Sequence, residues 1–131
     1  MLKKSDIKYL IVHCSDTPNK KDIGAIEIHK MHLSFGWDGI GYHKIIKKDG
    51  SIENGRPEYW IGAHVYGKNQ RSLGVCLIGK ESFSEKQFSA LENVLVNWKK
   101  KYKNALICGH RDILKTNKTC PNFDVMSWCK T

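Results

Sequence analysis

Three uninterrupted apolar runs of strand length constrain the fold more than any other feature of this sequence. They are YLIVHC at residues 9–14, LGVCLIG at residues 73–79 and ALICG at residues 105–109. Runs without alternating polar positions are typical of strands that are covered on both faces, as in the parallel part of a sheet. The pattern therefore predicts a buried strand at residues 9–14, a central strand at residues 73–79 and a further strand at residues 105–109.

An amphipathic helix is predicted between the second and third runs. Ser84 and Gln87 match a capping box, which marks a helix start. Apolar residues follow at helical spacing: Phe88, Leu91, Val94, Leu95, Trp98 and Tyr102. The lysines at 99–101 and 103 lie where the helix dipole is negative, so they need no binding role.

Two shorter helices and a hairpin complete the predicted elements. One helix is expected to start at an Asp22 cap and to end at about Phe35, and another is expected around residues 124–129. Four residues are expected to lie along one side of the first helix: Ile23, Ile26, Lys30 and Leu33. Residues 42–48 predict a strand before Asp49-Gly50, a dipeptide favoured in hairpin turns. Residues 1–131 are therefore predicted to form a single α/β domain, with a central mixed sheet flanked by about three helices.

The charge of the chain narrows the class of partner. Lys and Arg number 22 against 13 Asp and Glu, which gives a net charge of +9. Such an excess favours nucleic acid, anionic lipid or a carboxylate-rich cell wall, and it equally fits a solvated, solubilising surface. Arginine, the main residue of base readout, occurs only at Arg56, Arg71 and Arg111. We expect no specific nucleic-acid binding.

Hydropathy and cysteine usage exclude other classes. No apolar run reaches the roughly 18 residues of a membrane span, and the first residues lack a secretory pattern, so neither membrane insertion nor a signal peptide is expected. Five cysteines without a CxxC pair do not indicate a disulfide scaffold. Cys14, Cys76 and Cys108 lie in apolar runs and are expected to be buried. Cys120 lies in a polar loop directly before Pro121, a place that suits a ligand or a reactive thiol.

The strand predictions make two of the six histidines candidate metal ligands. His13 and His110 lie at the downstream ends of apolar runs, and they emerge together if their strands are neighbours. Cys120 can complete a trio with them. Two imidazoles and a thiolate suit zinc, and a fourth position left to water makes such a site catalytic. The spacing matches no local ligand signature, so core or surface histidines remain the alternative.

The other histidines and two further residues have different expected roles. His29 and His32 are expected to be surface or packing residues, His43 to be a structural hydrogen-bonding residue, and His64 to be a candidate for the cleft lining. Hydroxide formed on zinc can attack an amide carbonyl, and the developing charge needs a donor. Tyr42 and Lys118 are candidates for that donor, and the alternatives are an aromatic packed at a sheet edge and an exposed lysine.

Five ordered segments resemble the zinc-dependent N-acetylmuramoyl-L-alanine amidases. They are IVHCSDT, GWDGIGYHKIIKKDGSIENGR, IGAH, NQRSLGVCLIG, and GHRD followed by KTCPNFD. This family is shared with peptidoglycan recognition proteins, and the short lysozymes of T-odd coliphages are the members that the chain resembles most. The resemblance covers residues from about 9 to 128. It implies the fold of these proteins, a zinc cofactor and hydrolysis of the amide between N-acetylmuramic acid and L-alanine.

The resemblance also implies roles for individual residues. His13, His110 and Cys120 match the zinc ligands, and Tyr42 and Lys118 match the active-site tyrosine and lysine. A second set lies in segments that border the substrate groove of the family: His64, Trp37 and Trp60. A phage or prophage endolysin of this kind is made in the host cytoplasm and reaches the periplasm or cell wall through a separate holin-type pore. We expect a monomer that acts on peptidoglycan.

Two alternatives from other functional classes stay open. One is a binding protein that inhibits a phage RNA polymerase, alone or together with the amidase activity. The other is a glycosidase that works by paired carboxylates, for which Glu27, Glu53 and Glu58 are available. Digested peptidoglycan distinguishes the two hydrolases, because an amidase frees stem peptides and a glycosidase frees disaccharides.

Overall fold

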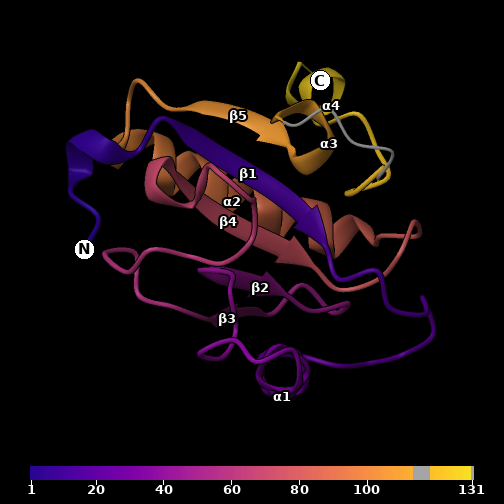
Figure 1. Cartoon of the computed structure of the whole chain (residues 1–131). Coiled ribbons are helices and arrows are strands. Elements are labelled where there is room, and N and C mark those ends of the chain that lie inside the picture. The colour runs from indigo at the N-terminus through magenta and orange to yellow at the C-terminus, as the bar shows by residue number, and fades with distance from the viewer. Residues whose placement is uncertain (114–118, 131) are drawn as a thin grey trace.

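The computed structural model describes residues 1–113 and 119–130, and its centre is one five-stranded mixed sheet (Figure 1). The strand order is β3-β2-β4-β1-β5. β1 pairs in parallel with β4 and β5, β2 pairs in parallel with β4, and β3 is antiparallel to β2. The three apolar runs form β1, β4 and β5, as predicted, and the structure makes them neighbours, with β5 at the sheet edge and its Leu106 exposed. The strands are β1 (Tyr9–Cys14), β2 (Lys44–Ile46), β3 (Ile52–Asn54), β4 (Ser72–Leu77) and β5 (Leu106–Gly109).

The predicted hairpin joins β2 to β3 through a short loop. The Lys47 N–H donates to the Ser51 carbonyl at 2.9 Å, and the Gly50 N–H donates to the Lys47 carbonyl at 2.9 Å. Gly50 has a φ of 88°, in the left-handed region that glycine adopts without a Cβ clash. The Asp49-Gly50 dipeptide therefore lies in the turn, where glycine readily takes the left-handed conformation that a tight hairpin needs.

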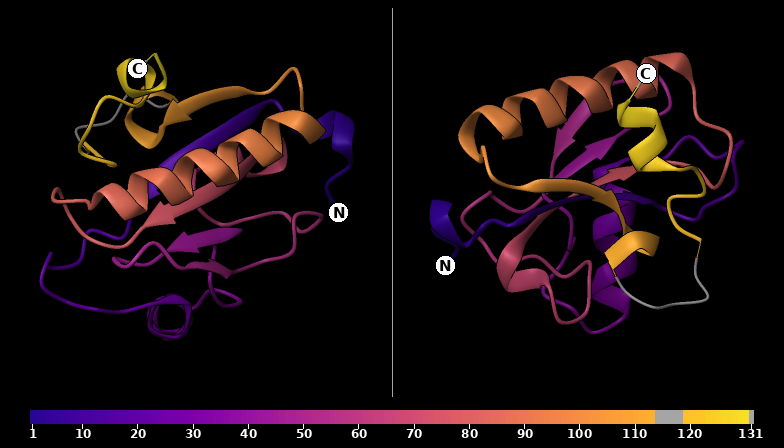
Figure 2. Two further views of the ribbon diagram at one scale, coloured as in Figure 1. Left: turned by 180° about the vertical axis from the view of Figure 1, so that it is seen from behind. Right: turned by 90° about the horizontal axis from the view of Figure 1, so that it is seen from above.

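One face of the sheet is covered by α2 (Glu85–Lys101), which runs along it (Figure 2). The helix starts at the predicted capping box: the Gln87 N–H donates to Ser84 Oγ at 3.1 Å, and the Ser84 N–H donates to Gln87 Oε1 at 3.0 Å. Its predicted apolar face packs on the largest core cluster. At its end, Lys99 Nζ donates to the Lys103 and Ala105 carbonyls at 2.9 and 2.8 Å. Buried members of this cluster include Leu10, Val12, Leu73, Val75, Leu77, Leu91, Val94, Leu95 and Trp98.

The opposite face is covered in part by α1 (Ala25–Ser34), whose start differs from the sequence prediction. The N-cap is Gly24, and the expected cap at Asp22 is wrong. Two carboxylates serve the first turn instead, because the Gly24 N–H donates to Glu27 Oε2 at 3.0 Å and the Ala25 N–H donates to Glu53 Oε1 at 2.8 Å. Glu53 belongs to β3, so the helix start depends on a residue that is distant in sequence.

The buried side of α1 also differs from the prediction. Ile28 and His32, one turn apart, are buried, whereas Ile26 and Leu33 are exposed. Ile28 belongs to a second core cluster together with Ile23, Ile40, Ile45 and Ile78. Ile23, which precedes the helix, is buried in this cluster, whereas Ile26, Lys30 and Leu33 lie on the exposed side of the helix.

The remaining helices are short. α3 (His110–Ile113) is a single turn that follows β5 directly and was not predicted, and α4 (Val125–Cys129) lies where the third helix was expected. Asp124 caps α4, since its Oδ1 accepts from the Ser127 N–H at 3.2 Å. Two 3-10 turns lie at Lys4–Asp6 and Asn69–Arg71. Among the described residues, no helix is long and apolar enough to cross a membrane.

Candidate active site

The two candidate ligand histidines meet because β1 and β5 are neighbours in parallel register. Val12 lies opposite Gly109, so His13 in β1 and His110, the first residue of α3 directly after β5, lie at the same end of the sheet. Their ring centroids are 4.8 Å apart. The expectation of two neighbouring imidazoles at this end of the sheet is therefore met by the geometry.

Two backbone N–H groups, each from the residue that follows one of the histidines, hold Cys120 beside them. The Arg111 N–H donates to the Cys120 carbonyl at 2.9 Å, and the Cys14 N–H donates to Cys120 Sγ at 3.1 Å. One side-chain ligand atom from each of His13, His110 and Cys120 lies within 4.8 Å of the others. The fold thus gathers two imidazoles and a thiol that are distant in sequence.

These residues line a cleft of about 750 Å³. Tyr42 belongs to it, with a ring centroid 5.1 Å from that of His13, and Trp37 and His64 also line it. Trp60 lies in a separate cavity beside α1 and is not brought to this cleft. Lys118 lies outside the described residues. The full lining is His13, Cys14, Ser15, Asp16, Trp37, Tyr42, Ala63, His64, Val65, Tyr66, Asn69, His110, Thr119, Cys120 and Asn122.

Burial sets the protonation states in the cleft. It lowers the pKa of His13 well below the ordinary value, and positive charge on His64 and His110 would lower it further, so the imidazole is neutral as a metal ligand must be. Burial raises the pKa of Tyr42 well above the ordinary value, so the phenol keeps its proton and can donate it. The hydrogen bond with Cys14, and then burial, raise the pKa of Cys120. A thiolate at Cys120 therefore needs a nearby cation.

The sequence matches the family model for N-acetylmuramoyl-L-alanine amidase over residues 3–123. The chain belongs to this amidase family. It is 39% identical over 137 residues to an endolysin of Enterobacteria phage K11, covering 98% of the chain and 89% of the relative. It is 38% identical over 127 residues to the endolysin of Escherichia phage T7, covering 91% and 83%. These relatives and the fold identify it as a peptidoglycan amidase of the endolysin type.

Solved structures agree with this family. The amidase matches N-acetylmuramoyl-L-alanine amidase LysC from Clostridium intestinale with a TM-score of 0.83 and 26% identity, covering 100% of this chain and 91% of that one. It matches bumblebee PGRP-SA with a TM-score of 0.82 and 27% identity, covering 96% and 81%. The α/β fold expected from the sequence is therefore confirmed.

Three other histidines of the amidase, His29, His32 and His43, form hydrogen bonds with backbone groups. His29 Nδ1 accepts from the Ile40 N–H at 3.0 Å, and His32 Nδ1 accepts from the Gly41 N–H at 2.9 Å. His43 Nδ1 accepts from the Gly74 N–H at 3.1 Å, and its Nε2–H donates to the Trp60 carbonyl at 2.8 Å. His43 thus makes structural hydrogen bonds of the kind that was expected, whereas His29 and His32, expected to be surface or packing residues, also accept backbone hydrogen bonds.

Two residues of the cleft were not recognised from the sequence. Cys14 is buried as expected, but its backbone N–H also donates to Cys120 Sγ, and its own sulfur accepts from Asn122 Nδ2 at 3.7 Å. Asn122 has a φ of 68°, a left-handed conformation that asparagine tolerates better than most residues. The position of Cys14 next to His13 was the only available signal, because the contacts with Asn122 and Cys120 exist only in the folded chain.

The carboxylates of the glycosidase alternative have structural roles. Glu27 and Glu53 bind the first N–H groups of α1. Glu58 accepts from the Tyr102 hydroxyl at 2.8 Å and pairs with Lys101 at 3.3 Å. None of the three lines the cleft of His13. The structure therefore gives no support to hydrolysis by these carboxylates.

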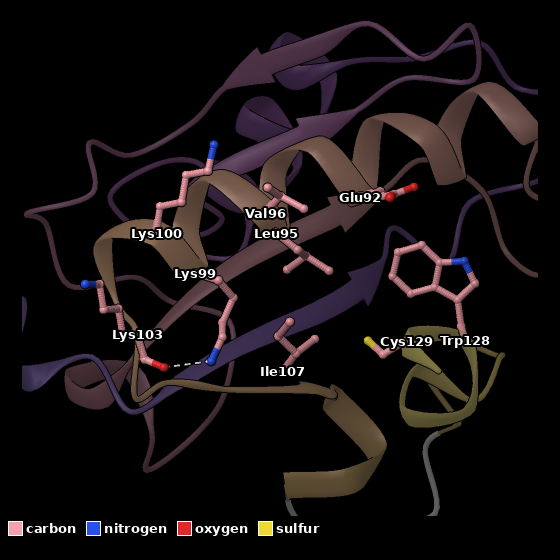
Figure 3. Close-up of a pocket in the computed structure, with 9 residues that line it drawn as sticks. All are labelled: Glu92, Leu95, Val96, Lys99, Lys100, Lys103, Ile107, Trp128 and Cys129. Carbon is pink, nitrogen blue, oxygen red and sulfur yellow. Dashed lines mark hydrogen bonds between the residues drawn. The ribbon is translucent and has the colours of Figure 1, made fainter. Parts of the chain in front are cut away.

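A second cavity, of about 510 Å³, lies on the α2 side of the molecule, between α2, β5 and α4 (Figure 3). Apolar side chains and lysines surround it, and Glu92 and Cys129 complete its lining. Among the described residues that line it, there is no imidazole that could bind a metal or transfer a proton near neutral pH. The apolar and cationic members are Leu95, Val96, Ile107, Trp128, Lys99, Lys100 and Lys103.

Proposed function

We propose that this amidase uses zinc to hydrolyse the amide between N-acetylmuramic acid and the L-alanine of the stem peptide. His13, His110 and Cys120 are the proposed zinc ligands. The observation that carries this is the convergence of their ligand atoms within 4.8 Å at the edge of an open cleft. Three protein ligands with a position open to solvent are typical of catalytic zinc, and two imidazoles with a thiolate are a known donor set.

Bound zinc would supply a Lewis acid and a water of lowered pKa, and the protein groups around it complete the chemistry. Tyr42 keeps its phenolic proton in the cleft and can donate it to the carbonyl oxygen as negative charge develops there. Lys118 is proposed for the same task as a cation two residues before Cys120. Trp37, 42% exposed at the cleft, offers an aromatic face to the substrate.

The charge of the protein fits a polyanionic target. A net charge of +9 raises the rate of encounter with a carboxylate-rich wall. We propose that the protein is made in the host cytoplasm and acts on the wall after release by a separate pore. Inhibition of a phage RNA polymerase stays a prediction, and a pull-down with the Cys120→Ser variant would test it separately from hydrolysis.

The test combines metal content with product analysis. Purified protein is stripped with a chelator, assayed on peptidoglycan, and assayed again after zinc is added. We expect one zinc per chain, loss and recovery of activity, and free stem peptides in the mass spectrum. Cys120→Ser should lose zinc, whereas Cys129→Ser, at an exposed cysteine of α4, should keep it. Activity that survives complete removal of the metal would overturn the proposal.

A further inference from the structure

His64 is held by hydrogen bonds within the protein at both ring nitrogens. Its Nδ1 lies 2.9 Å from Nε2 of His13, and its Nε2 lies 3.4 Å from Oγ of Ser72. The Ser72 hydroxyl in turn donates to the Lys68 carbonyl at 2.8 Å. These contacts form a chain that runs from a backbone carbonyl to a proposed zinc ligand. His64 therefore has a partner other than the substrate at each nitrogen.

The Lys68 carbonyl fixes which group donates in each hydrogen bond of this chain. A carbonyl can only accept, so the single hydroxyl proton of Ser72 is committed to Lys68. Ser72 Oγ must then accept from His64, which places the His64 proton on Nε2. A neutral imidazole carries one proton, so His64 Nδ1 is an acceptor and His13 Nε2 is the donor. The proton of His13 is thereby placed on Nε2, and its Nδ1 keeps a lone pair.

The surroundings of His64 are shaped to hold this ring. A Cβ built on Gly62 or on Gly74 would come within 2.6 Å of an atom of the His64 ring, so only glycine leaves room on these two sides. Asn69 Oδ1 accepts from the backbone N–H groups of His64 and Val65, each at 3.0 Å. Ring position and backbone position are therefore both set before any ligand arrives.

We propose that His64, oriented by Ser72, is a positioning residue that holds His13 in its Nε2–H tautomer and so presents Nδ1 of His13 to the metal. The reverse orientation of the chain would place the proton on Nδ1 of His13, where it would block coordination. Hydrogen-bond partners of this kind fix the ring orientation and raise the basicity of ligand histidines. This inference rests on the proposed zinc site, and it replaces a substrate contact as the expected role of His64.

The first experiment measures the tautomer in the zinc-free protein. Long-range ¹H–¹⁵N correlation spectra of the wild type distinguish a protonated Nε2 from a protonated Nδ1 in each histidine. We expect protonated Nε2 in both His13 and His64. Protonated Nδ1 in either ring would overturn the inference. Because this measurement needs no metal, its failure is distinct from a failure of the wild type to bind zinc.

The second experiment measures zinc affinity by competition with a chromophoric chelator. His64→Phe fills the same space without nitrogens, and His64→Asn restores an acceptor near the place of Nδ1. We expect a loss of about 10- to 100-fold for His64→Phe, the scale known for partners of metal ligands, with substantial recovery in His64→Asn and a smaller loss in Ser72→Ala. Ser89→Ala, at an exposed serine of α2, is the matched control and should bind zinc as the wild type does.

Kinetics separate positioning from substrate contact. At saturating zinc, a positioning role predicts that His64→Phe lowers kcat with little change in KM. Wild-type zinc affinity in a folded His64→Phe variant, or a raised KM as its only defect, would contradict the proposal. If His64→Phe does not fold, Ser72→Ala and the tautomer spectra decide the question.

Discussion

One buried glutamine, Gln87, ties the start of α2 to the sheet and permits a quantitative test of the fold. Its side chain is 1% exposed. Oε1 accepts from the Ser84 N–H at 3.0 Å, while Nε2 donates to the carbonyls of Ile78 at 2.9 Å and Ile46 at 3.3 Å. Gln87→Glu keeps the size and the acceptor but replaces the donor by an oxygen that faces these two carbonyls.

The expected loss of stability follows from protonation. A carboxylate facing two carbonyls is repelled, so the favourable state of Glu at position 87 is the neutral acid. Protonating a carboxyl of ordinary pKa, about 4.3, costs about 3.7 kcal/mol at pH 7 and about 1 kcal/mol at pH 5. The neutral acid donates one hydrogen bond where the amide donated two, which costs about 1 kcal/mol more. We expect a loss of about 4–5 kcal/mol at pH 7 and about 2 kcal/mol at pH 5.

Urea unfolding at both pH values measures this loss relative to the wild type. The dependence of the unfolding free energy on urea should be unchanged, so that the shift in midpoint reports stability alone. Gln70→Glu makes the same chemical change at an exposed position and should lie within about 0.5 kcal/mol of the wild type. A loss below about 1 kcal/mol at pH 7, or a loss that does not shrink at pH 5, would refute the reasoning.

Two further predictions concern the pH dependence of stability and the close contact between the backbones at Gly41 and Ala63. Burial lowers the pKa of His43, so the unfolded chain binds this proton more readily than the native chain does. Stability should therefore fall as pH drops below about 6.5, by at most about 1.4 kcal/mol per pH unit for this group. When unfolding free energies are measured with urea from pH 7.5 to 5, their dependence on pH should be shallower in His43→Asn than in the wild type. An equal pH dependence in the two proteins would contradict this prediction. A Cβ on Gly41 would lie 2.0 Å from the Ala63 carbonyl oxygen, so Gly41→Ala must displace the backbone that carries Tyr42. We expect a loss of about 3 kcal/mol in stability and at least about tenfold in activity, whereas wild-type thermal unfolding and turnover would show that the backbone yields freely.

Elements with local causes were predicted well. The apolar runs became β1, β4 and β5, the Ser84 capping box starts α2, and Asp49-Gly50 forms the hairpin turn. Each of these depends on residues within a few positions of one another. The start of α1 was missed because its cap is not local: Glu53, 28 residues after Ala25, supplies part of it.

The amino-acid sequence by itself determined that His13 and His110 lie at the downstream ends of apolar strand segments and that Cys120 stands in a polar loop, because hydrophobic periodicity and turn chemistry are local properties. Only the tertiary structure decided that the three lie within 4.8 Å, that Trp60 lies elsewhere, and that His64 contacts His13. Those distances depend on the register of β1 against β4 and β5 and on how the loops pack at the sheet end. Strand register is set by the burial of whole faces, so no short segment encodes it.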